Sequence, residues 1–270
     1  MRIAVIGMGA LGTLFADALA PVADVAGVDR TSAPPHEIAP VDVALVCVKS
    51  PGTRWAADAA ALLLANDGVA VTLQNGLGHL EVLAERLGPD RAAQGATSEG
   101  ARREAGRVVR AGRGATVLAP HPAGTSSRAR LEALAAVLER AGFPTRVVDD
   151  ARDVVWRKLA VNAAINPLTA LLRITNGALL EHPAAATADA LAREIAAVAR
   201  AEGIPFWDGE AVRGWREVAE ATRANRSSML QDVERGTPTE IDAICGAAAR
   251  EGERLGVATP LCAAMTTLLA

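Results

Sequence analysis

The 270-residue chain contains no tyrosine, and its other aromatic residues are four Trp and three Phe. The absence of tyrosine excludes the Tyr–Lys mechanism of short-chain dehydrogenases. The scarcity of aromatic residues leaves few side chains on which nucleic-acid bases would stack. Because the formal net charge is −3, the chain also lacks the basic surplus typical of proteins that bind nucleic acids or anionic membranes.

Long apolar runs are missing too, since no stretch of about 18 uninterrupted apolar residues suggests a membrane span. The three cysteines, Cys47, Cys245 and Cys262, are odd in number and lack the spacing of metal ligands. We interpret them as small buried thiols in a reduced compartment, and we expect no metal site. The sequence therefore predicts a cytoplasmic protein with no nucleic-acid or membrane partner.

The first half of the chain alternates short β-rich runs with helical patterns. We expect strands at 2–7, 24–28, 42–49, 68–75 and 144–150, and helices at 11–20, 54–65 and 128–142. This alternation predicts a doubly wound α/β fold, with helices on both faces of a parallel sheet. Two further expectations concern the segment "TSAPPHEIAP", whose prolines prevent a full helix, and residues 106–120, where two β runs around a glycine turn suggest a hairpin.

The pattern changes near residue 150, after which strand signals nearly vanish. Helices are expected at 154–172, 184–203, 214–224 and 239–256. We therefore predict two domains, an α/β domain over 1–149 and an all-α domain over 150–270. No long Gly/Ser linker separates them, so we expect the two to pack directly together.

The stretch "GMGALG" places Gly7, Gly9 and Gly12 in a G-x-G-x-x-G pattern between the first strand and the first helix. In this context the first glycine permits a tight turn, and the second lets the backbone approach a pyrophosphate. The third allows close packing of helix on strand, and the helix N-terminus attracts the anion. The motif predicts a dinucleotide-binding site, although a purely structural glycine turn would show the same spacing.

The second strand ends with Asp29 and Arg30, which leaves the choice of dinucleotide open. An acid there would bond the ribose hydroxyls of NAD, whereas an arginine would favour the 2′-phosphate of NADP. Lys49 and Asn75 follow the third and fourth strands, at the sheet edge where ligands bind in open α/β folds. Each residue also has a purely structural interpretation. Lys49 would then be a solvated loop lysine, and Asn75 would belong to an Asn-Gly turn.

Lys158, Asn162 and Asn166 are spaced four residues apart within the apolar helix expected at 154–172. This spacing places all three on one helix face about 12 Å long. A solvated face would account for the stripe, but such a face would normally carry more charge. Because unpaired buried polar groups are costly, we favour the interpretation of a substrate-binding wall.

Hydride transfer to a carbonyl creates an alkoxide that needs a proton and a nearby positive charge. Tyrosine is absent, and the four histidines (His36, His79, His121 and His182) are expected in turns or loops without a partnering acid. Lys158 therefore becomes the favoured proton donor. The two amides of the stripe would bond a substrate hydroxyl or carboxylate without adding charge.

Several stretches together resemble the ketopantoate reductase (2-dehydropantoate 2-reductase) family along nearly the whole chain. They are "GMGALG", "VKS", "LQNG", "WRKLAVNAAINPLTAL", "ITNGALL", "SSMLQDVERGTPTEID" and "GVATP". The resemblance implies a Rossmann domain followed by a helical C-terminal domain, with the active site in the cleft between them. It also implies NADPH-dependent reduction of 2-dehydropantoate to pantoate, in the pathway to coenzyme A.

The resemblance also assigns residue roles. It implies that Lys158 and Glu240 are catalytic, with Glu240 also near the cofactor ribose. The implied substrate-binding residues are Asn162, Asn166, Asn176 and Ser228. The implied cofactor-binding residues are Gly7, Met8, Gly9, Ala10, Leu11, Gly12, Arg30, Lys49, Asn75 and Glu240.

Two features depart from the family pattern: the short "TSAPPHEIAP" segment, and the negative charge of Asp29 beside Arg30. Both bear on cofactor preference more than on reaction type. The sequence predicts an NADP(H)-dependent reductase of a small 2-oxo acid, present as a monomer or homodimer. The alternatives are a related reductase of another 2-oxo acid, a non-catalytic NADP(H)-binding redox sensor, and an inactive dinucleotide-fold protein.

Overall fold

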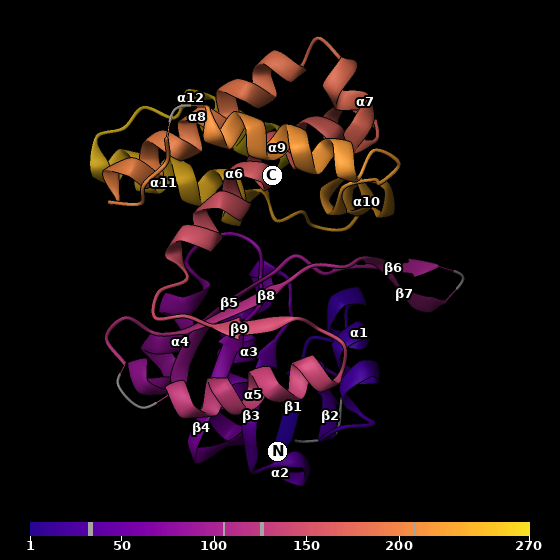
Figure 1. Ribbon diagram of the computed structural model, residues 1–270, viewed down its shortest axis with the longest axis vertical. Helices are drawn as coiled ribbons and strands as arrows, with labels where there is room; N and C mark the ends of the chain where they lie inside the picture. Colours follow the sequence, from indigo (N-terminus) through magenta and orange to yellow (C-terminus); the bar gives the residue numbers. More distant parts are fainter. Residues whose placement is uncertain (32–34, 105, 125–126, 208) are drawn as a thin grey trace. The chain divides into compact units, whose positions relative to one another are not determined.

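The computed structural model describes residues 1–31, 35–104, 106–124, 127–207 and 209–270. The chain divides into two compact units, shown in Figure 1. The first unit comprises 1–74 and 78–151, and the second comprises 75–77 and 152–270.

The first unit is built on a seven-stranded sheet with the order β2-β1-β3-β4-β5-β8-β9. Its strands are β1 (Arg2–Ile6), β2 (Asp24–Val28), β3 (Val41–Val46), β4 (Leu64–Thr72), β5 (Ala92–Thr97), β8 (Thr116–Pro120) and β9 (Thr145–Val147). Every neighbouring pair is parallel except β5 and β8. The mostly parallel α/β fold that we predicted is confirmed.

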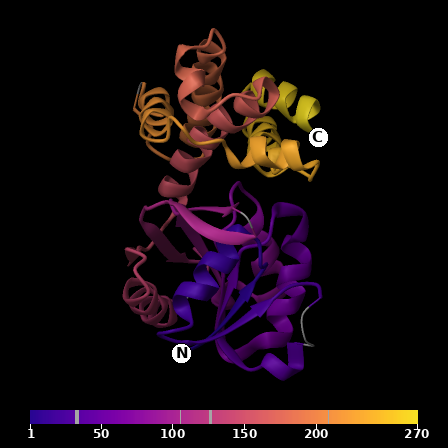
Figure 2. The same cartoon turned by 90° about the vertical axis from the view of Figure 1, so that its right-hand side faces the viewer.

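Helices cover both faces of this sheet because alternate strand residues are apolar on both sides. One face packs Ile3, Val5 and Leu45 against α1 (Ala10–Leu19) and α5 (Arg128–Arg140). The other face packs Ala4 and Ile6 against α3 (Thr53–Leu63) and α4 (His79–Leu87). Figure 2 shows the sheet of this unit between its helices.

Short elements complete the first unit: α2 (Pro35–Ile38), η1 (Ser50–Gly52) and η2 (Pro89–Arg91). The single turn of α2 agrees with the expectation that the proline-rich segment holds no full helix, although residues 32–34 of that segment lie outside the described part. The histidine prediction was partly wrong. His36 lies within α2 and His79 begins α4, whereas His121 and His182 lie in loops. The His79 ring is buried and bonds the hydroxyl of Thr53.

The expected hairpin over 106–120 is wrong. Strand β7 (Arg107–Gly112) pairs with β6 (Gly100–Glu104) in a separate two-stranded sheet, while β8 joins the main sheet beside β5. The reversal lies before β7, where Gly106 has a φ of +83°. Strand β6 was not predicted because its charged sequence, "GARRE", lacks the apolar alternation by which half-buried strands are identified.

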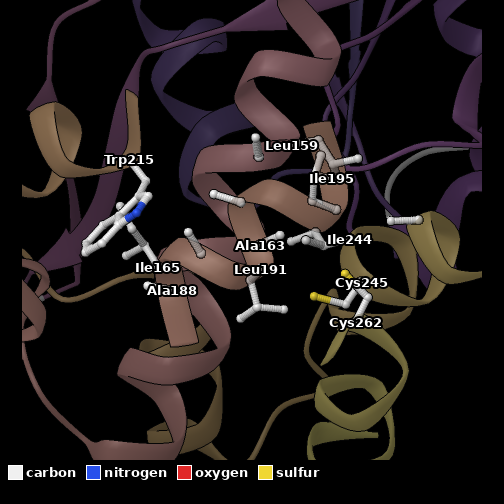
Figure 3. Packing of buried hydrophobic residues seen from close by; sticks show 14 of the residues in the cluster. Leu159, Ala163, Ile165, Ala188, Leu191, Ile195, Trp215, Ile244, Cys245 and Cys262 are labelled. Carbon is white, nitrogen blue, oxygen red and sulfur yellow. The ribbon is translucent and has the colours of Figure 1, made fainter. Parts of the chain in front are cut away.

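The second unit is entirely helical in its described part. Its helices are α6 (Arg152–Leu172), α7 (Asn176–Glu181), α8 (Ala185–Ala201), α9 (Glu210–Ala221), α10 (Ser228–Arg235), the π-helical turn η3 (Asp242–Gly246), α11 (Ala247–Leu255) and α12 (Pro260–Leu269). The core around α6 and α8 buries Leu159, Ala163, Leu191 and Trp215, as Figure 3 shows. No helix in the described residues is long and apolar enough to cross a membrane.

Candidate functional site

The glycine turn lies at the topological switch point of the sheet, where strand order reverses on either side of β1. Strand β1 pairs with β2 on one side and β3 on the other. Gly7 adopts a φ of +103°, and a Cβ there would lie 2.6 Å from the backbone nitrogen of Val48, which follows β3. Only glycine fits this turn, and ligands bind at such switch points in open α/β sheets.

The other two glycines of the motif differ in what surrounds them. A Cβ on Gly12 would lie 2.0 Å from the carbonyl oxygen of Gly7, so the protein's own backbone leaves no room for a side chain at this position. A Cβ on Gly9 would meet nothing within 4 Å. Gly9 caps α1 without a side-chain hydrogen bond, and the first turn of the helix contains no acidic residue. The turn therefore offers space and uncapped N–H groups, which fit the phosphates of a dinucleotide.

The remaining residues of the motif pack into the unit. Met8 and Leu11 are partly buried against the core on the α1 face of the sheet. Ala10 is the first residue of α1. The side chains of Met8 and Leu11 pack against the core, so any contact of these two residues with the phosphates would come from their backbone N–H groups.

Asp29 and Arg30 follow β2 and engage different neighbours. The Asp29 carboxylate accepts hydrogen bonds from the backbone N–H and the hydroxyl of Thr31, both at 2.8 Å. The Arg30 guanidinium lies over the Trp55 ring, 5.8 Å from its centroid, within the range of a cation–π contact. Asp29 thus folds back on its own loop, while the arginine is held against α3. Lys49 is exposed just after β3.

The predicted polar stripe lies on α6, in the second unit. Lys158 keeps part of its surface accessible. Burial of its ammonium lowers its pKa from 10.5 to about 8, and the carboxylate of Glu240 opposes this by raising it. An ammonium whose pKa lies close to neutral pH is suited to donating a proton during a reaction.

Glu240 connects Lys158 to Asn75. The Asn75 amide nitrogen donates to Glu240 at 3.3 Å, so the carboxylate is shared between an ammonium and an amide. The backbone carbonyl of Glu240 accepts the N–H groups of Ala243 and Ile244 at the start of the helix. Just before this helix, the Thr239 hydroxyl accepts the N–H of Ile241, whereas the Thr237 hydroxyl donates to the carbonyl of Asp232.

The π-helical turn η3 fixes the segment that carries Asn75. The carbonyl of Ala243 accepts the N–H of Leu77 at 3.0 Å. Gly76 has a φ of +97°, and a Cβ there would lie 2.4 Å from that same carbonyl oxygen. Residues 75–77 therefore belong to the helical unit although they follow β4 in the chain. Sequence reasoning identified Asn75 but not the role of Gly76, for which the only signal was the Asn-Gly pair.

The amides of the stripe are available to a ligand. Among the described residues, the side chains of Asn162 and Asn166 have no hydrogen-bond partner in the protein, although Asn166 is buried. Pro167 follows directly and cannot donate to the carbonyl of Ala163, while Thr169 bonds the carbonyls of Ile165 and Asn166.

Asn176 presents one unsatisfied atom. Its amide nitrogen donates to Thr222 at 2.9 Å, and its backbone N–H bonds the carbonyl of Asn225. Its buried carbonyl oxygen Oδ1 has no partner in the described residues. Because a buried acceptor without a donor is costly, a hydroxyl or N–H donor from a ligand would satisfy it.

Ser228 is the exposed first residue of α10, and this helix packs on α6. The preceding Ser227 caps α10 by accepting the N–H of Leu230, and its hydroxyl also shares a hydrogen bond with the hydroxyl of Thr169 on α6. An anion at this helix start would meet the Ser228 hydroxyl and the positive end of the helix dipole. The cap at Ser227 was not anticipated from the sequence.

The predicted residues thus fall into two sets. Asn75, Lys158 and Glu240 come together in the helical unit, which also contains Asn162, Asn166, Asn176 and Ser228. The glycine turn, Arg30 and Lys49 belong to the sheet unit. No group of three or more His, Cys, Asp or Glu side chains in the described part of the chain could hold a metal ion.

Comparison with known families agrees with this organisation. The family described as "Ketopantoate reductase PanE/ApbA" matches residues 25–123, and "Ketopantoate reductase PanE/ApbA C terminal" matches residues 150–270. The 2-dehydropantoate 2-reductase of Archaeoglobus fulgidus is 40% identical over 230 residues, covering 84% of this chain and 74% of that relative.

Solved structures show the same similarity. The crystal structure of 2-dehydropantoate 2-reductase from Geobacter metallireducens matches with a TM-score of 0.91 and 30% identity, covering 100% of this chain and 99% of that one. A complex of D-mandelate dehydrogenase with NADH matches with a TM-score of 0.89 and 26% identity, covering 100% and 97%. On the sequence matches in both parts of the chain and on the shared fold, this protein is a member of the ketopantoate reductase family.

Proposed function

We propose that this protein reduces 2-dehydropantoate to pantoate with NADPH. The observation that carries the proposal is the group formed by Lys158, Glu240 and Asn75, in which an ammonium of lowered pKa lies beside a carboxylate held by an amide. The Archaeoglobus fulgidus and Geobacter metallireducens relatives bear the name of this activity. We further propose that the enzyme is cytoplasmic and works as a monomer or homodimer.

The chain's own residues account for binding and proton transfer. A reduced nicotinamide dinucleotide would supply the hydride. Lys158 donates its proton to the ketone oxygen as that oxygen becomes an alkoxide, and its positive charge stabilises the developing negative charge. Glu240 favours the protonated form of Lys158.

The other residues of the helical unit position the substrate. Ser228 and the start of α10 bind its carboxylate. Asn162, Asn166 and Asn176 bond its hydroxyl and carbonyl groups, which supplies the partner that the Asn176 Oδ1 atom lacks. In the sheet unit, residues 7–12 bind the dinucleotide phosphates, and Lys49 adds a positive charge at the end of β3.

The pH dependence follows from the pKa of Lys158. Reduction requires the protonated ammonium, so its rate should fall as the pH rises above about 8. Because Glu240 raises this pKa, Glu240→Gln should move the fall in rate to lower pH. The chain has only two lysines, Lys49 and Lys158, so NMR titration of the ¹³C-dimethylated protein can follow Lys158 directly, with Lys49→Arg as the assignment control. An unshifted profile in Glu240→Gln would contradict the role of this carboxylate.

Cofactor preference rests on Arg30, whose fixed positive charge beside Trp55 suits a 2′-phosphate. We expect Arg30→Ala to weaken NADPH binding about 10- to 100-fold. The affinity for NADH, which lacks the 2′-phosphate, should stay the same and serves as the internal control. Equal losses for both dinucleotides, or none, would remove Arg30 from this role.

A reductase of another 2-oxo acid is the second candidate function. It is favoured by the similarity to D-mandelate dehydrogenase, which was solved with NADH. The same proton donor and carboxylate site would serve either substrate, and pocket contacts alone separate close analogues by only about 10- to 200-fold. Initial rates with 2-dehydropantoate and with phenylglyoxylate, the oxidation product of mandelate, distinguish the two. A non-catalytic sensor would bind NADPH and turn over neither acid.

A further inference from the structure

The hairpin β6–β7 packs against α1, the helix that begins at the glycine turn. From this hairpin Arg103 reaches the turn itself. Its Nη2 atom donates to the carbonyl oxygen of Met8 at 2.8 Å, across 95 residues of sequence separation. Met8 stands between Gly7 and Gly9, so a guanidinium lies at the loop that the motif assigns to the phosphates.

Among the described residues, no carboxylate neutralises the charge of Arg103. No carboxylate pairs with this guanidinium in the described part of the chain, whereas the adjacent Arg102 donates to Glu104 at 2.6 Å. One guanidinium carries five N–H donors in a planar fork that matches phosphate oxygens. The contact with Met8 occupies one donor and orients the group, which leaves the others for a ligand.

The hairpin does not need Arg103 to stay in place. At its other end Arg110 forms a bidentate pair with the buried side chain of Glu99, with both N–O distances at 2.6 Å. Arg110 also stacks on Phe143 and donates to the carbonyl of Gly142. The contacts of Arg110 that hold the hairpin on the sheet unit are therefore separate from the contact of Arg103 at the glycine turn.

We propose that Arg103 binds the pyrophosphate of the dinucleotide, opposite the N–H groups of α1. The three observations combine in this assignment: an uncompensated cation, a direct contact with the glycine turn, and open space at Gly9 where a phosphate would enter. The inference rests on the proposed function, because it concerns the same dinucleotide. Unlike Arg30, Arg103 would recognise the part that NADPH and NADH share.

Arg103→Gln tests the assignment, with Arg102→Gln as the matched control on the same strand. Dissociation constants for NADPH and NADH are measured by fluorescence titration of the full chain at 50 mM and 500 mM NaCl, together with Tm. We expect Arg103→Gln to weaken both dinucleotides about 10- to 30-fold at low salt. The loss should shrink at high salt, because salt screens a charge contact on an exposed side chain. Arg102→Gln should bind both dinucleotides as the unmodified protein does.

The outcomes separate the inference from the proposed function. If the unmodified protein binds neither dinucleotide, the proposed function itself fails. If it binds both and Arg103→Gln binds them equally well, only the Arg103 assignment is overturned. A loss confined to NADPH would move Arg103 to the 2′-phosphate. A salt-independent loss with a lowered Tm would make it a structural clamp of the glycine turn, and both results contradict the pyrophosphate contact.

Discussion

Lys158→Ala should lower kcat for ketone reduction by about 10² to 10⁴, the usual contribution of a positioned acid–base group. The effect should fall on kcat more than on KM, because the ammonium gains its largest interaction as the alkoxide forms. Initial rates at saturating NADPH and 2-oxo acid, measured at pH 7, report this change. Turnover at the level of the unmodified enzyme would remove Lys158 from the mechanism.

Stability measurements serve as the control for this variant. Folding lowers the pKa of Lys158 from 10.5 to about 8, so between these values the unfolded chain binds more protons than the folded one. The unfavourable contribution of Lys158 to folding is therefore complete below pH 8 and fades as the pH rises towards 10.5. Lys158→Met, which keeps the apolar stem, should consequently lose activity at pH 7 without losing stability. A large fall in Tm would mean that the lost rate reflects unfolding.

Gly9→Ala and Gly12→Ala should both weaken dinucleotide binding, but for different reasons, although both residues lie in the same motif. Gly9 has a φ of −69°, which alanine adopts, and a Cβ there would meet no atom of the described residues within 4 Å apart from its chain neighbours. We therefore expect Gly9→Ala to keep the Tm of the free protein while weakening both dinucleotides about 10- to 100-fold, because the methyl group occupies the space of the pyrophosphate.

Gly12→Ala should damage the protein itself. Its Cβ would lie 2.0 Å from the Gly7 carbonyl oxygen, so α1 must move away from β1. The expected cost is about 1–3 kcal/mol of unfolding free energy, as for other overpacked sites, in addition to the loss of binding. Thermal unfolding without ligand, followed by dinucleotide titration, separates the two variants. Unchanged affinity in Gly9→Ala would show that the open space is not the phosphate site.

The spacing of residues predicted much of this arrangement. Alternating β and helical patterns were sufficient to identify the parallel core of the sheet, since strands such as β1 and β3 are continuous apolar runs. The four-residue period of Lys158, Asn162 and Asn166 indicated their common helix before the structure placed them on α6. These features are local, so they can be recognised in a short window of sequence.

Features that depend on distant contacts escaped prediction. Strand β5 was missed because "AAQGAT" carries a single β-branched residue, and β6 was missed because it is charged. The close approach of Gly76 to Ala243 joins segments more than 160 residues apart, and no local pattern specifies it. The contact of Arg103 with Met8 is likewise non-local. Such contacts are set by packing of whole elements rather than by their propensities.

The most direct test of the central claim is the decrease of NADPH absorbance on addition of 2-dehydropantoate, repeated with NADH and with other 2-oxo acids. We expect rapid turnover with NADPH and 2-dehydropantoate, and slower turnover with the other pairs. Binding of NADPH without turnover of any 2-oxo acid would contradict it, and Lys158 would then need a role other than proton donor.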